Sequence, residues 1–158
     1  MADGRTGGRA DWRAASSEWP AGGGWRVVAA APPDRQTQCM QPLAIHHVSI
    51  NVPDVALGVT FYTEVLGGTL RNDRPDFGFG GAWIDFGASQ IHLLEAAAPL
   101  ALGQHFAVRV ADLDEVVGEL RNRGITVGDP NPVGAGRQTF LADPAGNTVE
   151  LYEGPTGP

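Results

Sequence analysis

The sequence contains no lysine and only one cysteine, and no hydrophobic run in it approaches the length of a membrane-spanning helix. Its 11 basic residues are therefore all arginines, and they face 18 acidic residues, which gives a formal net charge of −7. An acidic chain without a basic run is a poor ligand for nucleic acid, and one cysteine cannot form an internal disulfide. The first residues also lack the apolar core of a signal peptide. We therefore expect a cytoplasmic protein that binds neither nucleic acid nor a membrane.

The composition of the chain changes near residue 42. Residues 1–42 show no sustained helix or strand period and carry 5 arginines and 4 acidic residues, so their net charge is +1. Residues 43–158 carry 6 arginines, 14 acidic residues and all four histidines. We expect a disordered extension over 1–42 and a folded domain over 43–158.

The second part contains an internal repeat with an offset of 58 residues. HHVSINVPDV (46–55) is similar to QHFAVRVADL (104–113), and the same offset places QIHLLE (90–95) on TVELYE (148–153) and Asp85 on Asp143. A match at both ends of a unit without a gap indicates duplication. We expect two modules, at about 43–96 and 104–153, and neither is large enough to bury an adequate core alone.

Each module follows the pattern strand–helix–three strands. The first is predicted to hold a strand at 45–52, a helix at 55–66 begun by Asp54, and strands at about 69–74, 82–86 and 89–95. The second is predicted to hold a strand at 105–111, a helix at 112–123, and strands near 125–128, 138–143 and 147–152, with the turn DPAGN before the last of them. The sequence therefore predicts an α+β fold of two βαβββ modules.

Alternation along the strands places four candidate metal ligands on the sheet face away from the helices. They are His47, His92, His105 and Glu150, and both modules separate their pair by 45 residues. A single strand histidine is more often a surface residue than a ligand, but four liganding types at repeat-equivalent positions favour a site for a divalent transition metal. Zn, Ni, Fe, Mn and Co all suit such ligands, whereas Mg and Ca do not.

Weaker candidates for substrate contacts lie on the same strands. Arg109 could bind a substrate carboxylate or phosphonate or be a solvated arginine paired with an acid. Arg137, at the start of a predicted strand, could reach the mouth of the cleft. The aromatic residues Phe77, Phe79 and Trp83 could wall an apolar pocket or pack in the core.

These residues lie in segments that resemble the vicinal oxygen chelate superfamily, which includes glyoxalases, bleomycin resistance proteins and extradiol dioxygenases. The segments are HHVSINVPDVALGVTFYTEVLGG, GAWIDFGASQIHLLE, HFAVRVADLDEVVGELRNRGI and DPAGNTVELYE, and RPDFGFGGAWID is similar to small glyoxalase-like proteins. The resemblance implies paired modules that form a curved sheet around a metal-containing cleft, usually in a homodimer. It also implies ligand positions at His47, His105 and Glu150, whereas His92 stands where relatives have a ligand Glu or Gln.

Three functions are compatible with these residues. Four protein ligands on an octahedral metal leave two adjacent positions for a small substrate with vicinal oxygens, and Glu150 could then remove a proton to give an enediolate, as in a lactoylglutathione lyase-like lyase or isomerase. If only His47, His105 and Glu150 bind, the set suits an extradiol-type Fe(II) dioxygenase, and His92 becomes an acid–base group. The third is a non-catalytic protein that binds small molecules or drugs. We expect the first, in a homodimer whose cleft forms within one chain or across two.

Overall fold

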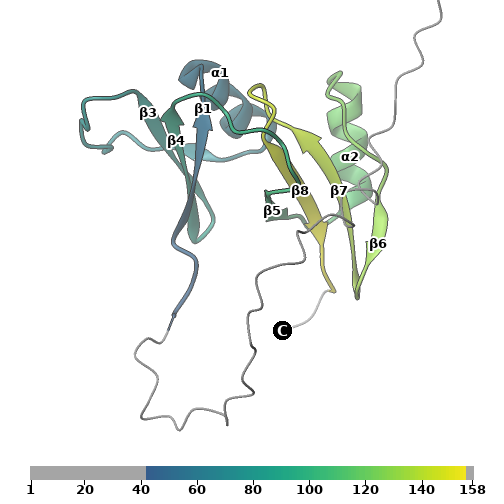
Figure 1. Cartoon of the computed structure of the whole chain (residues 1–158). Coiled ribbons are helices and arrows are strands. Elements are labelled where there is room, and N and C mark those ends of the chain that lie inside the picture. The colour runs from purple at the N-terminus through teal and green to yellow at the C-terminus, as the bar shows by residue number, and fades with distance from the viewer. Residues whose placement is uncertain (1–41, 156–158) are drawn as a thin grey trace, which may run out of the picture. The chain divides into compact units, whose positions relative to one another are not determined.

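Two strand–helix–three-strand units follow one another along the chain, and Figure 1 shows a sheet in each of them. The computed structural model describes residues 42–155, so the expected extension lies outside the described residues except for its last position. The first unit comprises β1 (His47–Val52), α1 (Val55–Thr60), the π-helical turn η2 (Phe61–Val65), β2 (Thr69–Leu70), β3 (Gly81–Phe86) and β4 (Ser89–Glu95). The second comprises β5 (His105–Arg109), α2 (Leu113–Asn122), β6 (Asn131–Val133), β7 (Gly136–Ala142) and β8 (Thr148–Glu153).

The two sheets have the same strand order. The order is β1-β4-β3-β2 in the first sheet and β5-β8-β7-β6 in the second. The parallel pairs are β1 with β4 and β5 with β8. His47 lies opposite Gln90, and His105 lies opposite Thr148, 58 positions further along in both strands. The predicted α+β fold of two βαβββ modules is confirmed.

An aspartate at the end of the first strand begins the helix in both modules. The side chain of Asp54 accepts a hydrogen bond from the backbone N–H of Leu57 at 3.0 Å, and Asp112 accepts one from that of Glu115 at 2.9 Å. These bonds satisfy N–H groups that have no partner within the helix. The strand face and the helix are thus positioned relative to each other in the same way in both modules.

The repeat is not free of gaps, contrary to the prediction. Trp83 lies opposite His92, whereas Phe140, only 57 positions after Trp83, lies opposite Glu150. The extra residue lies in the turn before β8, where Asp143 accepts bonds from two backbone N–H groups of the turn. The predicted equivalence of Asp85 with Asp143 is therefore wrong, because Asp85 is a strand residue opposite Gln90.

The strand predicted near 125–128 is also wrong. The backbone N–H of Ile125 donates to Leu120 O at 2.9 Å, so this residue closes the end of α2, and Val127 makes only an isolated bridge to Leu141. The strand that pairs with this edge of β7 is instead β6, which follows later in the sequence. The second strand of the first module is likewise shorter than its predicted range 69–74, since β2 ends at Leu70.

Hydrophobic side chains on the helix-facing side of both sheets form one core. It contains Val52, Ile84, Ile91 and Leu93 from the first module and Val149 and Leu151 from the second, all buried. The hydroxyl of Tyr62 donates to a buried oxygen of Asp143 at 2.9 Å, and the side-chain amide of Asn147 donates to Asn51 O at 3.0 Å. These two hydrogen bonds join the modules beside the shared core.

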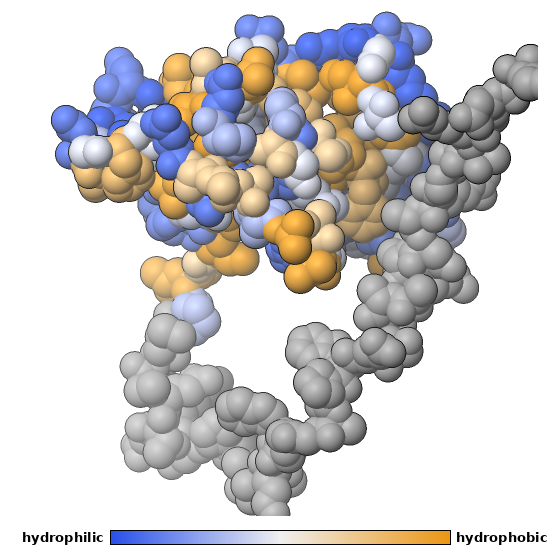
Figure 2. Space-filling view, turned by 45° about the horizontal axis from the view of Figure 1, so that its top comes forward, coloured by the Kyte–Doolittle hydropathy of each residue, from blue (hydrophilic) through white to orange (hydrophobic). Residues whose placement is uncertain are grey.

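The surface of the described residues carries both polar and large apolar side chains. Figure 2 shows hydrophobic residues among hydrophilic ones on the face that it presents. The exposed large apolar residues include Leu57, Leu70, Phe77 and Phe79. Others lie at the start of the described residues and in the link between the modules. No helix within 42–155 is long and apolar enough to cross a membrane.

Candidate functional site

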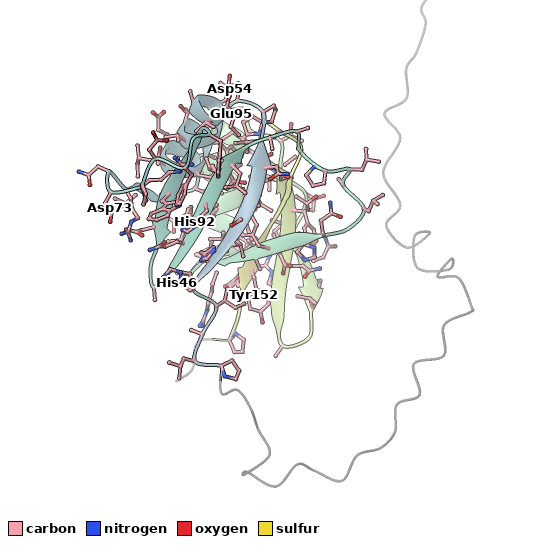
Figure 3. The ribbon with its side chains drawn as sticks, turned by 60° about the vertical axis from the view of Figure 1, so that its left-hand side comes forward. His46, Asp54, Asp73, His92, Glu95 and Tyr152 are labelled. Atoms are coloured by element: carbon pink, nitrogen blue, oxygen red, sulfur yellow. The ribbon has the colours of Figure 1, made fainter. Side chains whose placement is uncertain are left out.

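Two of the four predicted ligands lie side by side on the first sheet. The rings of His47 on β1 and His92 on β4 stack with centroids 4.1 Å apart and an angle of 12° between their planes. Both side chains lie on the face opposite the core, as the alternation predicted, since Val48 and Ile91 pack on the other side. Figure 3 shows His92 on this sheet, with His46 at the lower end of β1.

The surroundings of His92 keep one ring nitrogen free. Its Nε2 lies 2.9 Å from Oε1 of Gln90, and because an amide oxygen only accepts, Nε2 carries the proton in this hydrogen bond. Nδ1 then presents a lone pair, which is the form that binds a metal. Burial lowers the pKa of His92, and the nearby charges of His47, His46, Arg71 and Arg74 lower it further. The neutral imidazole is therefore favoured.

The ring of His47 also contacts that of His46, the residue that precedes it in the sequence. Nδ1 of His47 lies 2.9 Å from Nδ1 of His46, and the two rings meet edge to face. This contact leaves Nε2 of His47 without a hydrogen-bond partner among residues 42–155. His46, to which the sequence assigned no function, is thus a direct neighbour of a predicted ligand.

The second pair of predicted ligands lies on the second sheet. Nε2 of His105 on β5 is 2.9 Å from Oε2 of Glu150 on β8. Nδ1 of His105 lies 2.8 Å from Gly103 O, a carbonyl that only accepts, so Nδ1 carries a proton, and Nε2 faces the carboxylate oxygen, to which it donates when it is protonated as well. Glu150 is buried, with 8% of its surface exposed, because β5 and β7 flank it on both sides.

The donor atoms of this pair fit a divalent transition metal. The 2.9 Å separation of the two atoms is an ordinary N–H···O hydrogen-bond distance, and it also leaves both of them within reach of one cation about 2.1 Å from each. The backbone carbonyl of Gly103 fixes the imidazole in the orientation that a second-sphere acceptor typically gives a metal-binding histidine. Imidazole nitrogen and carboxylate oxygen are also the donors that such metals prefer.

The structure does not unite the two pairs into one cluster. Within residues 42–155 there is no group of three or more His, Cys, Asp or Glu side chains that could hold a metal ion. A pocket of about 290 Å³ lies between the modules, and residues of β1, of the link and of β5 line it, among them Ser49, Asn51, Gln104 and His105. The predicted ligands therefore form two separate pairs in the described residues, here termed half-sites, and His105 lies beside a pocket that the first module shares.

The structure separates the two predicted substrate arginines. Arg109 is exposed on the same face as His105, where its guanidinium donates to Pro155 O at 3.2 Å. Arg137 instead makes two hydrogen bonds of 2.7 Å to the carboxylate of Asp114, in the first turn of α2. That pairing holds the pKa of Asp114 below its usual range and occupies the guanidinium. Arg137 thus links β7 to the first turn of α2, and its contact with a substrate stays a prediction.

The predicted aromatic residues lie beside His92. Trp83 on β3 stacks on the imidazole with centroids 4.7 Å apart and an angle of 17°. Phe77 and Phe79 belong to the segment between β2 and β3, and their rings stack at 5.8 Å. Phe77 also lies 6.2 Å from Trp83. All three are therefore outside the core, on the side of the predicted ligands.

Three neighbours of the ligands were missed by the sequence reasoning. They are Gln90 beside His92, Gly103 beside His105, and Phe140, whose ring meets that of His105 edge to face at 5.3 Å. Gln90 could have been found, because it lies two residues before His92 on the same strand face. Phe140 was hidden by the one-residue slip, which makes it the counterpart of Trp83.

Comparison with known proteins agrees with the fold. The family model of the Glyoxalase/Bleomycin resistance protein/Dioxygenase superfamily matches residues 44–151. A putative glyoxalase family protein from Bacillus anthracis has a solved structure that superposes with a TM-score of 0.66 at 27% identity, over 73% of this chain and 98% of that one.

Curated relatives carry different activities. A 2-epi-5-epi-valiolone epimerase from Actinomyces sp is 31% identical over 73% of this chain and 81% of its own length. A lactoylglutathione lyase from Arabidopsis thaliana is 31% identical over 70% of this chain and 44% of its own length. The family match, which spans both modules, and these similarities show that the chain belongs to the Glyoxalase/Bleomycin resistance protein/Dioxygenase superfamily.

Proposed function

We propose that this protein is a metal-dependent, glyoxalase-like lyase or isomerase that acts on a small substrate with vicinal oxygens. Members of the superfamily are mostly enzymes that act on small molecules, and they usually bind divalent metals. The proposed ligands are His47, His92, His105 and Glu150, and the proposed metal is Zn, Ni, Fe, Mn or Co.

The observation that carries this proposal is the pair His105–Glu150. The carboxylate oxygen lies 2.9 Å from Nε2, and Gly103 holds the imidazole so that this nitrogen faces the carboxylate. The first pair supports the same interpretation, because Gln90 leaves Nδ1 of His92 free to coordinate.

Each proposed residue has a defined part in the reaction. A bound divalent cation would polarise the substrate carbonyl and so acidify the neighbouring C–H group. Glu150 takes up that proton and returns it to the adjacent carbon, with little water around its buried carboxylate. Trp83 and Phe79 wall the substrate on the side of the first sheet, and Arg109 offers its guanidinium to an anionic group on the second.

A complete site requires the two half-sites to meet. Since residues 42–155 of one chain contain no group of three ligand-type side chains, we propose that a homodimer brings His47 and His92 of one copy to His105 and Glu150 of the other. Superfamily members often form dimers. β1 and β5 each have one edge without a strand partner, which is the kind of surface that a second copy covers.

Metal analysis and one substitution test the proposal. Protein purified without chelator should contain about one transition-metal ion per chain, and Glu150→Gln should retain much of it while losing turnover by at least about a hundredfold, since an amide coordinates but accepts no proton. Full activity of Glu150→Gln would exclude Glu150 as the base. A metal-free protein whose melting temperature rises with none of the five ions would exclude the metal site.

The same protein preparation distinguishes the proposed lyase or isomerase from the alternative, an extradiol-type Fe(II) dioxygenase. His92→Ala should weaken metal binding together with activity if His92 is a ligand. In a dioxygenase the metal would be retained, and the wild-type protein would consume oxygen with a catechol. The matched control is Leu57→Ala, because Leu57 is an exposed residue of α1 and does not belong to the strands that carry the proposed ligands.

A further inference from the structure

Two large aromatic side chains are exposed in the segment between β2 and β3. Phe77 and Phe79 are 50% and 49% exposed, although each would gain free energy from burial, and their rings stack on one another. An exposed apolar surface of this kind often marks a binding site in a folded protein. The geometry of the segment must therefore hold the two rings in place without the support of a core.

Arg74 supplies that support. Its guanidinium lies 5.0 Å from the ring centre of Phe77 and 5.3 Å from that of Phe79, and it donates to Phe79 O at 3.0 Å and to Pro75 O. A Cβ at position 81 would clash with Leu93 O of the neighbouring strand and would also lie 3.0 Å from one guanidinium nitrogen of Arg74, so glycine at this position allows both to approach. The two rings and the cation therefore form one ordered surface.

The charge of Arg74 has no carboxylate partner among residues 42–155. Its Nε is shielded from solvent and makes no hydrogen bond there. Arg71, three residues earlier, contrasts with it, because Asp73 and Asp85 both pair with that side chain. A cation held between exposed rings without an anion is suited to a ligand that brings both an aromatic ring and a negative charge.

An unbroken series of rings connects this surface with the proposed metal ligands. Phe77 is followed by Trp83 at 6.2 Å, Trp83 by His92 at 4.7 Å, and His92 by His47 at 4.1 Å. Figure 3 shows Asp73 of the same segment extending from the sheet that carries His92.

We propose that Phe77, Phe79 and Arg74 select substrates in which an aromatic ring and a negative charge accompany the vicinal oxygens, as in an aryl-substituted hydroxy or oxo acid. The inference rests on the proposed function, because the vicinal oxygens of the substrate would face the metal ion held by the proposed histidine ligands. The ring of the substrate stacks on the Phe77–Phe79 pair, and its anionic group lies near Arg74. Substrates with a small aliphatic group in place of the ring would lose this contact.

The test compares three small ligands on the full-length protein loaded with Zn²⁺, Ni²⁺ or Co²⁺, whichever binds most tightly. Calorimetry measures the affinities for mandelate, for lactate, which has a methyl group in place of the phenyl ring, and for the neutral 1-phenylethane-1,2-diol. Mandelate should bind about tenfold more tightly than lactate. Phe77→Ala/Phe79→Ala should bring this ratio near one, whereas Leu57→Ala should preserve the ratio. Arg74→Gln should weaken mandelate by about two- to fivefold relative to the diol.

The possible failures are distinguishable. If the metal binds but the wild-type protein does not prefer mandelate, or the preference persists in Phe77→Ala/Phe79→Ala, the inference is overturned and the proposed function stands. If no metal binds in the preceding titration, the proposed function itself fails. A fall in the molecular mass of Phe77→Ala/Phe79→Ala by light scattering would identify the surface as a contact between copies and overturn the inference.

Discussion

Among single residues, His92 is a histidine whose charge is set by its surroundings. Burial disfavours the imidazolium, and the positive charges of Arg71 and Arg74 together with the neighbouring histidines act in the same direction. The rings of His47 and Trp83 stack against the imidazole of His92. The fold thus favours the neutral imidazole, which is the form that the proposed metal site requires.

The lowered pKa of His92 makes the stability of the metal-free protein depend on pH. A histidine in the unfolded chain has a pKa near 6.5, above that in the folded chain, so the unfolded state binds more protons between the two values. The contribution of His92 is therefore fully present above about pH 6.5 and is lost as the pH falls through the folded pKa. In His92→Gln the fall in melting temperature from pH 7.5 to pH 5 should be smaller than in the wild type, measured by thermal unfolding with chelator present. Leu57→Ala should show the wild-type slope; an equal slope in His92→Gln would contradict this assignment.

The alternation of side chains along a strand predicted the faces of the site residues. His47, His92, His105 and Glu150 all lie opposite the core as expected, because a strand has only two faces and the hydrophobic residues occupy one. The contacts that orient these side chains could not be predicted in the same way. Gly103 O reaches His105 from the link between the modules, where the sequence has no period. Likewise, Arg137 pairs with Asp114 across 23 residues of sequence, a distance over which no local pattern operates.

Among the secondary-structure elements, both helices depend on an aspartate at their first turn. Asp112 precedes α2 and accepts the N–H of Glu115, so its removal leaves that donor to water alone. The cap also fixes the point at which the chain turns from β5 into the helix. Asp54 performs the same task before α1.

Asp112→Ala should destabilise the protein by about 1 kcal/mol. Urea unfolding of the full chain, monitored by circular dichroism, measures the change. Glu119→Ala serves as the control, because Glu119 is an exposed residue of the same helix and should change the stability by less than about 0.5 kcal/mol. A loss in Asp112→Ala no greater than that of the control would show that the cap contributes nothing.

The repeat predicted the elements but not their full register. The parallel strands β1–β4 and β5–β8 follow the 58-residue offset because both are fixed by the same strand–helix entry. The antiparallel strand β7 slips by one residue because Asp143 and Asn147 form a longer turn than the one before β4. The strand predicted near 125–128 failed for a similar reason, since its first backbone N–H is used to end α2. Turns and helix ends therefore determine the strand register and the strand bounds, which the alternation of side chains does not fix.

For the whole domain, one buried hydrogen bond joins the modules beside the shared core. Tyr62 is fully buried, and its hydroxyl donates to Asp143, which also accepts from the side chain of Asn147. Burial raises the pKa of Tyr62 well above its usual range, and the charge of Asp143 adds to the effect, so the hydroxyl remains a donor. Neither module supplies both partners.

Tyr62→Phe should therefore destabilise the domain by about 1–2 kcal/mol, because Asp143 loses a buried donor and keeps only those within its own turn. Urea unfolding measures this loss as well. Tyr152→Phe is the matched control, since no hydrogen bond of its hydroxyl is present within residues 42–155. Equal stabilities of the two variants would mean that the contact between the modules rests on apolar packing alone.

The arrangement of the two half-sites makes a specific prediction for mixed dimers. One variant, His47→Ala/His92→Ala, lacks the first pair, and the other, His105→Ala/Glu150→Ala, lacks the second, so neither should retain metal by itself. If each site combines pairs from two copies, co-refolding an equal mixture gives about half mixed dimers, each with one intact site of two. Metal analysis after gel filtration should then find about a quarter of the wild-type content. A mixture that recovers no metal would contradict the crossed arrangement, because sites formed within one chain cannot be repaired by a second copy.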